Sequence, residues 1–208
     1  MPLFDEPSAH GAYAYVLCLT KTAGLRFLSP REFQEMIRRA IRRAGLDAVY
    51  SQGFSPVMKL STSPPTSYGI ASQCEYVQIE LKNPLNPERI ASLLGGHLPA
   101  GSSVVSCAEG KLRQVRAFTY TTARPFSLSL EPESCVIKEG KPLRVADYLE
   151  YEDPRTLRIA FRDGRTISPV LLLETFSQDR IRPGEIVKTG TLFADGPSLP
   201  QDTAGPGS

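Results

Sequence analysis

The sequence contains no tryptophan, only two histidines and only four cysteines among its 208 residues. So few histidines argue against a His-based metal site or a catalytic histidine array. The cysteines are far apart and form no C-x-x-C pair, which favours buried, reduced thiols and a cytoplasmic location. No run approaches 18 apolar residues, so neither a transmembrane helix nor a membrane partner is expected. The first residues also lack the basic and apolar regions of a signal peptide.

Motifs of the common enzyme classes are missing as well. The chain has no G-x-x-x-x-G-K-[ST] loop, no G-x-G-x-x-G after a strand and no G-x-S-x-G. Neither His10 nor His97 lies in a context that marks it as the base of a cysteine nucleophile. We therefore expect no catalytic residues, no metal and no cofactor, and a binding protein is favoured over an enzyme.

The composition that is present is that of an ordinary globular protein, with 41% hydrophobic and 22% charged residues. The net charge of +2 names no partner, but the charge is unevenly placed. Residues 21–59 contain eight Lys and Arg against three Asp and Glu. An anionic partner is therefore expected to bind this segment.

Residues 11–112 are predicted to form a ferredoxin-like β-α-β-β-α-β unit within an α+β fold. Ser29, Pro30 and Glu32 have the spacing of an N-terminal capping box, and Gly45 provides the matching helix end. The other predictions are strands at 12–19, 47–51, 75–81 and 103–108, an extended segment at 25–28, a Pro/Ser/Thr-rich connection at 52–74 and a helix at 86–94.

Residues 113–195 are predicted to form a second, degraded ferredoxin-like α+β unit. A turn-rich stretch at 131–142 replaces its first helix. The tails at 1–10 and 196–208 are predicted to be loose, the latter because it is rich in Gly, Pro and Ser. The other elements predicted for this unit are extended segments at 117–130, 143–151, 156–161 and 185–193 and a short helix at 168–176.

The first predicted helix carries the strongest local signal for binding. At 100° per residue, Phe33, Ile37 and Ile41 form its core face, and five arginines lie on the opposite side. Arginine binds phosphate in a bidentate manner and stacks on bases, which suits a nucleic-acid backbone. The alternative is a solvated face on which Glu35 pairs with Arg38 or Arg39. The arginines of this face are Arg31, Arg38, Arg39, Arg42 and Arg43, and Arg26 precedes them.

The 52–74 connection is long for a compact domain, and such loops are usually functional. We expect it to fold as an arm against the arginine surface, so that Gln52, Phe54, Lys59 and Tyr68 border one groove. Phe54 and Tyr68 would then stack on bases. The alternative is a hairpin arm whose aromatic rings pack on the sheet.

Several ordered blocks resemble a bacterial radical-SAM-linked family, a domain of unknown function found beside or fused to cobalamin-type radical SAM proteins. The similarity is dense over 14–108. The blocks are Leu25-Arg-Phe-Leu-Ser, Arg38-Arg-Ala-Ile-Arg-Arg-Ala-Gly-Leu, Tyr50-Ser-Gln-Gly-Phe-Ser-Pro, Lys59-Leu-Ser, Tyr68-Gly-Ile-Ala-Ser, Glu75-Tyr and Val187-Lys-Thr-Gly-Thr-Leu-Phe.

The resemblance implies a radical SAM protein encoded nearby as partner and an accessory role in RNA- or ribosome-related modification. The chain itself lacks the C-x-x-x-C-x-x-C that holds a radical SAM cluster. The family has histidines where this sequence has Pro30 and Val57, and an asparagine where it has Ser55. Roles that need those histidines are therefore not expected here.

Three functions follow as hypotheses. The first is a non-catalytic accessory protein that binds or presents RNA to a radical SAM enzyme. The second is a protein-docking module that does not touch RNA and uses sheet edges or the 52–74 arm. The third is a metal-independent RNA-processing enzyme, by fold analogy with CRISPR repeat-cleaving endoribonucleases and some pseudouridine synthases.

Overall fold

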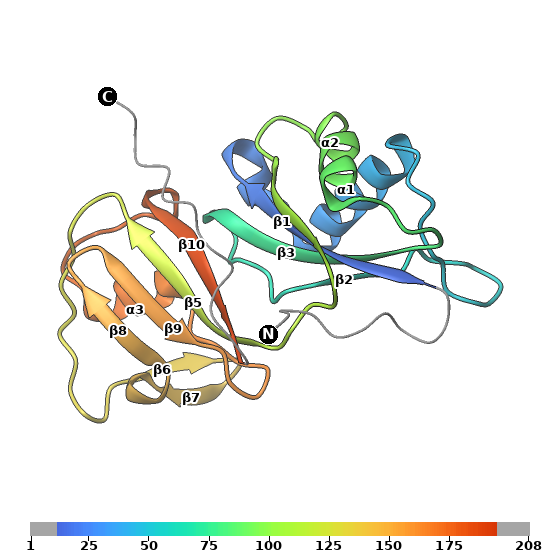
Figure 1. The fold of residues 1–208 in the computed structure, drawn as a ribbon. Helices are drawn as coiled ribbons and strands as arrows, with labels where there is room; N and C mark the ends of the chain where they lie inside the picture. The colour runs from blue at the N-terminus through green and yellow to red at the C-terminus, as the bar shows by residue number, and fades with distance from the viewer. Residues whose placement is uncertain (1–11, 195–208) are drawn as a thin grey trace.

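The computed structural model describes residues 12–194, which form a mixed α+β fold (Figure 1). The predicted tails at 1–10 and 196–208 lie outside these residues. Within 12–194, no helix is long and apolar enough to cross a membrane. The helices are α1 (Pro30–Arg43), α2 (Pro87–Gly95) and α3 (Pro169–Phe176), with short 3-10 turns η1 (Ala23–Phe27), η2 (Val145–Asp147) and η3 (Pro183–Glu185).

A single sheet runs through both halves of this region, and a small hairpin lies beside it (Figure 1). The sheet strands are β1 (Tyr13–Lys21), β2 (Leu60–Thr62), β3 (Ala71–Leu81), β4 (Val104–Glu109), β5 (Val115–Thr122), β8 (Leu149–Asp153), β9 (Thr156–Ala160) and β10 (Ile186–Phe193). The hairpin consists of β6 (Cys135–Lys138) and β7 (Lys141–Arg144).

The strand order is β4-β1-β3-β10-β5-β9-β8, and β2 pairs with a different part of β3. The β3–β10 pair is parallel and short, joining Ala71 to Val187 and Ser72 to Lys188, whereas the other pairs are antiparallel. The last strand of the described chain therefore joins the first half of the sheet to the second.

Each half has its own hydrophobic core, which explains the local architecture. In the first half, α1 and α2 bury Ile37, Ile41 and Ile90 against alternate residues of β1 and β3. In the second half, α3 packs on β5, β9 and β10. Ile70, which precedes β3, belongs to this second core although the first half supplies it.

Helix α1 confirms the sequence prediction in detail. Ser29 accepts a hydrogen bond from the Glu32 N–H, and the Glu32 side chain accepts one from the Ser29 N–H at 2.7 Å. Pro30 occupies the first turn, and the backbone at Gly45 has a φ of 68°. Both helix ends are thus satisfied by the residues that predicted them. The predicted helices at 86–94 and 168–176 are also present, as α2 and α3.

Two predictions for the first half are wrong. The segment 25–28 is not extended, because Leu25 and Leu28 close the 3-10 turn η1 through backbone hydrogen bonds. The segment 47–51 makes only isolated bridges, Ala48 to Leu81 and Tyr50 to Met58. The regular pairing with β3 belongs instead to β2 at Leu60–Thr62.

The predictions for the second half also need correction. In place of the extended segment predicted at 117–130, the structure has β5 at Val115–Thr122, which begins two residues earlier and ends eight residues earlier than predicted. The turn-rich stretch 131–142 contributes to the β6–β7 hairpin. The strand predicted at 143–151 is divided by η2, and β8 begins at Leu149. The α+β class is therefore correct.

Candidate functional site

The exposed side of α1 carries four of its five arginines. Arg31, Arg39, Arg42 and Arg43 are exposed, whereas Arg38 is half-buried. The core residues of the helix lie on the opposite side, so packing does not constrain the exposed guanidinium groups. Arg42 and Arg43 lie in the last turn, where cations also interact favourably with the helix dipole.

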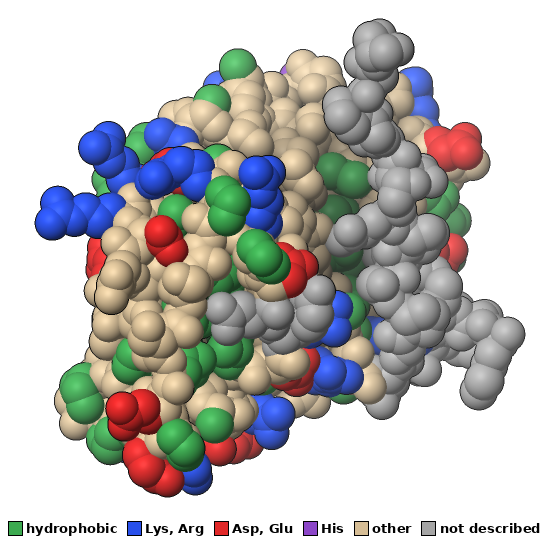
Figure 2. All heavy atoms as spheres, turned by 90° about the vertical axis from the view of Figure 1, so that its left-hand side faces the viewer, with side chains coloured by type: hydrophobic (Ala, Val, Ile, Leu, Met, Phe, Trp, Pro, Cys, Tyr) green, Lys and Arg blue, Asp and Glu red, His purple; other side chains and the backbone are tan. Residues whose placement is uncertain are grey.

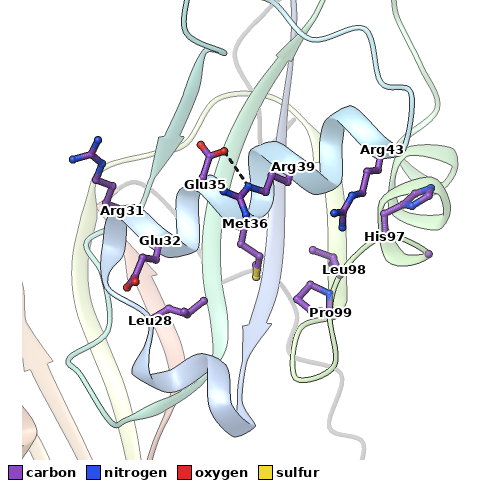
Figure 3. Close-up of a pocket in the computed structure, with 11 residues that line it drawn as sticks. Leu28, Arg31, Glu32, Glu35, Met36, Arg39, Arg43, His97, Leu98 and Pro99 are labelled. Atoms are coloured by element: carbon purple, nitrogen blue, oxygen red, sulfur yellow. Dashed lines mark hydrogen bonds and ion pairs between the residues drawn. The ribbon is translucent and has the colours of Figure 1, made fainter.

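A groove of about 800 Å³ runs along this side of the helix. Figure 3 shows Arg43 and His97 at one end of the groove and Arg31 at the other. The opposite wall is formed by Gly96, His97, Leu98 and Pro99, which follow the end of α2. Its lining consists of Leu28, Arg31, Glu32, Glu35, Met36, Arg39, Arg43, Gly96, His97, Leu98 and Pro99.

The positive charge of the helix is only partly neutralised. Glu35 contacts Arg39 at 3.3 Å and Arg42 at 3.1 Å, and both pairs are solvent-exposed. Such exposed pairs are weak, so an anionic ligand can compete for these arginines. No ion pair holds Arg31 or Arg43 among residues 12–194.

The remaining arginine of the helix, Arg38, is placed differently from the others. Like Arg42 it does not line the groove, but unlike Arg42 it is half-buried, and its Nε is buried without a hydrogen-bond partner. Gln34, one turn before it, donates to the hydroxyl of Thr62 at 3.2 Å. Arg38 is therefore not one of the arginines that line the groove.

The arm at 52–74 leaves the sheet as an excursion from its edge. Val49 donates to the Glu80 carbonyl, Lys59 donates to the Val49 carbonyl, and β2 then resumes pairing with β3. Between these points the chain forms a projecting turn, which Ser51 and Val57 close with hydrogen bonds.

The side chains of this turn reach into solvent. Phe54 is fully exposed, and Gln52 beside it is exposed as well. Lys59, at the base of the turn, contacts the carboxylate of Glu80 at 3.4 Å. The alternative to a binding arm was a hairpin whose aromatic rings pack on the sheet. The exposed ring of Phe54 does not fit that alternative.

The single groove predicted for the arm is not formed. Phe54 lies in the turn that branches from the sheet beside Glu80, near the Leu81 end of β3, whereas Tyr68 lies just before its Ala71 end. The 11 residues of β3, at a rise of about 3.3 Å each, span roughly 35 Å. The arm follows the edge of the sheet from one end to the other, so Tyr68 cannot share a groove with Gln52, Phe54 and Lys59.

Tyr68 instead lies beside η1. Its ring is 70% exposed and contacts Phe27, with 5.4 Å between the ring centroids. The guanidinium of Arg26 lies over the Phe27 ring at 4.8 Å. Of the predicted binding residues, the structure thus brings together Arg26 and Tyr68, and separately Arg31, Arg39 and Arg43 with Arg42 beside them.

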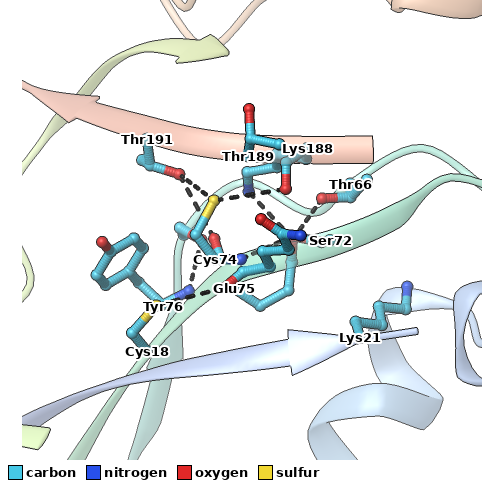
Figure 4. A network of polar contacts seen from close by, with 12 residues as sticks. Cys18, Lys21, Thr66, Ser72, Cys74, Glu75, Tyr76, Lys188, Thr189 and Thr191 are labelled. Carbon is cyan, nitrogen blue, oxygen red and sulfur yellow. Dashed lines mark hydrogen bonds and ion pairs between the residues drawn. The ribbon is translucent and has the colours of Figure 1, made fainter. Parts of the chain in front are cut away.

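A buried ionic network was not predicted from the sequence (Figure 4). Lys188 of β10 is fully buried and contacts the carboxylate of Glu75 on β3 at 3.1 Å. The hydroxyl of Thr66 donates to the same carboxylate, and the Lys188 ammonium also lies 4.6 Å from the centre of the Phe118 ring. The network therefore joins the two halves of the sheet where β3 and β10 meet.

A second buried lysine lies near this pair. Lys21 is 2% exposed and donates to the Leu28 carbonyl at 3.0 Å. Burial lowers the pKa of Lys21, and the negative charge of Glu75 partly opposes that effect. For Glu75, burial would raise the pKa, but Lys188 and the hydroxyls of Ser72 and Thr66 leave it below its ordinary value.

The predicted burial of the thiols holds only in part, because Cys135 is exposed at the start of β6. All four cysteines are free. Burial raises the pKa of the Cys18 and Cys107 thiols to about 12, and it also raises the pKa of Cys74. Within residues 12–194, no three His, Cys, Asp or Glu side chains are grouped to hold a metal ion.

We predict that the native protein has one rapidly reacting thiol per chain at pH 8. Cys135 is accessible, whereas the raised pKa values of the other thiols keep them protonated and unreactive. Ellman's reagent should report about one fast equivalent in buffer, and the remaining thiols should react only in denaturant. A Cys135→Ser variant that still reacts rapidly would contradict the assignment.

The family follows from the comparison with known proteins. A model of the family described as uncharacterized protein conserved in bacteria (DUF2344) matches residues 15–147. The chain belongs to this DUF2344 family. The match covers most of β1, α1 and its groove, the arm and the β6–β7 hairpin, and it stops before α3 and β10. No curated protein matches the chain.

The DUF2344 match includes Glu75 but not Lys188, its partner in the buried pair. The groove along α1, in contrast, is lined entirely by residues inside the matched region. The groove therefore lies within the part of the chain that matches the family model.

Proposed function

We propose that this DUF2344 protein is a non-catalytic accessory protein that binds RNA through the groove along α1. One observation carries the proposal: Arg31, Arg39 and Arg43 line a single open groove, and only Glu35 pairs with one of them. Guanidinium groups in such a row suit successive phosphates of a nucleic-acid strand. The two carboxylates at the groove, Glu32 and Glu35, are already engaged by the helix cap and by neighbouring arginines.

The proposed partner is a radical SAM protein encoded nearby, with the accessory protein presenting RNA to it. The support for this partner is the resemblance of the ordered sequence blocks described above. The proposal assigns no cofactor to this chain and takes the cytoplasm as its location. Co-purification of the two full-length proteins, followed by identification of bound RNA, tests the partnership directly.

We also interpret the chain as two ferredoxin-like units joined edge to edge. The support is the strand order: β4-β1-β3-β2 in the first half and β10-β5-β9-β8 in the second follow the same pattern. In the second half the β6–β7 hairpin stands where the first helix of such a unit would be.

We predict that Arg31→Glu, Arg39→Glu and Arg43→Glu together weaken RNA binding by about tenfold or more at moderate salt. Three phosphate contacts are lost and three repulsive charges are added. The slope of log affinity against log salt should fall by about 2 for single-stranded RNA, at ~0.7 per contact. Fluorescence anisotropy with a labelled single-stranded RNA measures both quantities. The fold should survive, because all three side chains are exposed.

A matched control reverses the same number of charges elsewhere. Lys111, Lys141 and Arg165 are exposed and have no ion pair among the described residues, and none of them lines the groove. Their change to Glu alters the net charge equally and should leave most of the affinity intact. Equal losses in both variants would mean that the groove is not the binding site.

One observation favours protein docking as a second candidate function. Phe54 projects fully exposed from the turn of the arm, and Val57 beside it is 52% exposed. Exposed apolar side chains at a projecting tip are typical of protein contacts. If reversing the charges of the groove arginines leaves RNA binding unchanged, protein docking through this tip becomes the better candidate function.

A further inference from the structure

The place where the two halves of the sheet meet carries an exposed aromatic pair. Phe27 is 45% exposed and Tyr68 is 70% exposed, although the two rings contact each other at 59° between their planes. Arg26 stacks on Phe27 and is half-buried. Soluble proteins rarely leave two adjacent large rings in solvent without using them in binding.

The backbone beneath these rings is firmly held. The Gly69 N–H donates to the Arg26 carbonyl at 3.0 Å, which ties the Tyr68 segment to η1. A Cβ on Gly69 would come within 3.2 Å of the Pro183 side chain, so η3 packs closely here. Ile70 is fully buried in the second core. The rings are thus presented on a rigid support that combines three segments of the chain, which lowers the entropy cost of binding a ligand.

Arg26 contacts the pair, and further basic side chains lie on the other side of η3. The Arg26 guanidinium packs against Gly184 of η3, where an added Cβ would lie 3.3 Å from its Nη1. Pro183 borders a hollow of about 910 Å³ that Arg180 and Arg182 also line. Figure 2 shows the face formed by the second half of the chain, where Lys and Arg side chains gather toward the top.

The carboxylates of the hollow have partners of their own. Glu185 is held by Arg124 at 2.7 Å, and Asp179 accepts hydrogen bonds from Ser127 and Ser177. Glu174 is the remaining acidic residue of the lining and is exposed. Arg180 and Arg182 have no ion pair among the described residues, so the hollow retains two free cations.

We infer that Phe27, Tyr68 and Arg26 form a stacking platform for an unpaired base of single-stranded RNA. The 70% exposed Tyr68 ring offers a surface on which a base can stack, its tilted contact with Phe27 holds it in place, and Arg26 and the arginines of the hollow would pair with the phosphates. Arg26 over the Phe27 ring and the arginines of the hollow supply the cations that a nucleic-acid strand requires beside a stacking ring, which favours a base over an apolar protein segment. The inference rests on the proposed function and adds base recognition to the charge recognition of the α1 groove.

The test compares three labelled probes of equal length with the full-length protein: single-stranded RNA, an abasic ribose-phosphate chain and double-stranded RNA. The wild type should bind single-stranded RNA more tightly than the abasic chain or the duplex, because only the first offers unpaired bases. Tyr68→Leu should weaken single-stranded RNA binding about tenfold, the loss of one stacked base. Tyr68→Phe should restore it, and binding of the abasic chain should not change in either variant.

The outcomes separate the platform from the α1 groove. Charge reversal of the groove arginines should weaken binding of all three probes, whereas Tyr68→Leu should weaken binding only of the RNA with unpaired bases. If the wild type binds the abasic chain as tightly as RNA, or if Tyr68→Leu binds like the wild type, the platform is overturned and the proposed function stands. If the wild type binds no RNA, both are overturned. If Tyr68→Leu instead abolishes only co-purification with the partner protein, the rings dock protein and not bases.

Discussion

Replacing Lys188 with Met is expected to lower the free energy of unfolding by about 3–5 kcal/mol at pH 7. The change removes the ammonium that contacts Glu75 and leaves that carboxylate charged, buried and without its cationic partner. A typical domain is stable by only about 5–15 kcal/mol, so this variant should be partly unfolded under mild conditions. Urea denaturation followed by circular dichroism measures the difference.

The pH dependence of the same variant provides a sharper check. In the wild type the pKa of Glu75 is lowered, so its contribution to stability is present above the unfolded pKa and is lost as the pH falls through the folded pKa. In Lys188→Met the hydroxyls of Ser72 and Thr66 remain, but the largest favourable contribution to the charged form of Glu75 is lost, so protonation of this carboxylate stabilises the folded state. The difference in unfolding free energy between the two proteins should therefore narrow as the pH falls toward the ordinary pKa of a carboxyl group. A difference that stays constant would show that Glu75 is not the group left unpaired.

Lys21→Met is the matched control within the network. Lys21 is as buried as Lys188, but it donates to a backbone carbonyl, and burial lowers its pKa. Removing a charge that the interior disfavours should change stability by only about 1 kcal/mol. If both lysine variants lose the same stability, general packing and not the Glu75 pair explains the effect.

Ile70→Ala is expected to cost about 2–5 kcal/mol of stability. Ile70 is fully buried in the second core although it comes from the first half of the chain, so the truncation leaves a cavity where the halves meet. Ile137→Ala is the control, because that side chain is 64% exposed and its loss should change stability by less than about 0.5 kcal/mol. Thermal and urea melts of both variants provide the measurement.

The shape of the transition in Ile70→Ala also bears on domain organisation. If the two halves unfold together, the whole transition should shift to lower urea with an unchanged slope. Two separate transitions, of which only one moves, would instead support independent units with a boundary near 112, as predicted from the sequence. An unchanged midpoint would show that Ile70 is not part of a tightly packed core.

Local signals predicted the helices well, because the residues that start and end a helix lie within it or next to it. Ser29, Pro30 and Glu32 determine the start of α1 through hydrogen bonds made within three residues of each other. Asn86 does the same for α2 by accepting from the Glu88 N–H. Such short-range interactions require no knowledge of the rest of the chain.

Strand assignment at the sheet edge failed because pairing is decided by distant residues. Val49 and Tyr50 have high β-propensity, yet the chain turns away from β3 after Val49 and returns only at Leu60. The intervening turn is determined by hydrogen bonds that its own residues exchange. The same excursion separated Phe54 from Tyr68, so the single groove predicted for the arm could not form.

The buried lysines were missed because a lone lysine in a strand normally indicates a solvent-facing position. One signal could have identified Lys188: it alternates in phase with Ile186 and Gly190, both of which are buried. Its partner Glu75 is 113 residues away and could not be inferred without the parallel pairing of β3 with β10. The contact between Phe27 and Tyr68 was hidden for the same reason.

The central place of β10 has a consequence for synthesis of the protein on the ribosome. Strands β1 to β9 leave the ribosome before β10, so the edges of β3 and β5 that it will occupy stay unpaired until then. Unpaired strand edges can pair with other chains. Until β10 is synthesised, the carboxylate of Glu75 also lacks the ammonium of Lys188 with which it pairs in the folded protein. Addition of β10 therefore joins the two halves of the sheet and completes the buried Lys188–Glu75 ion pair in the same late step.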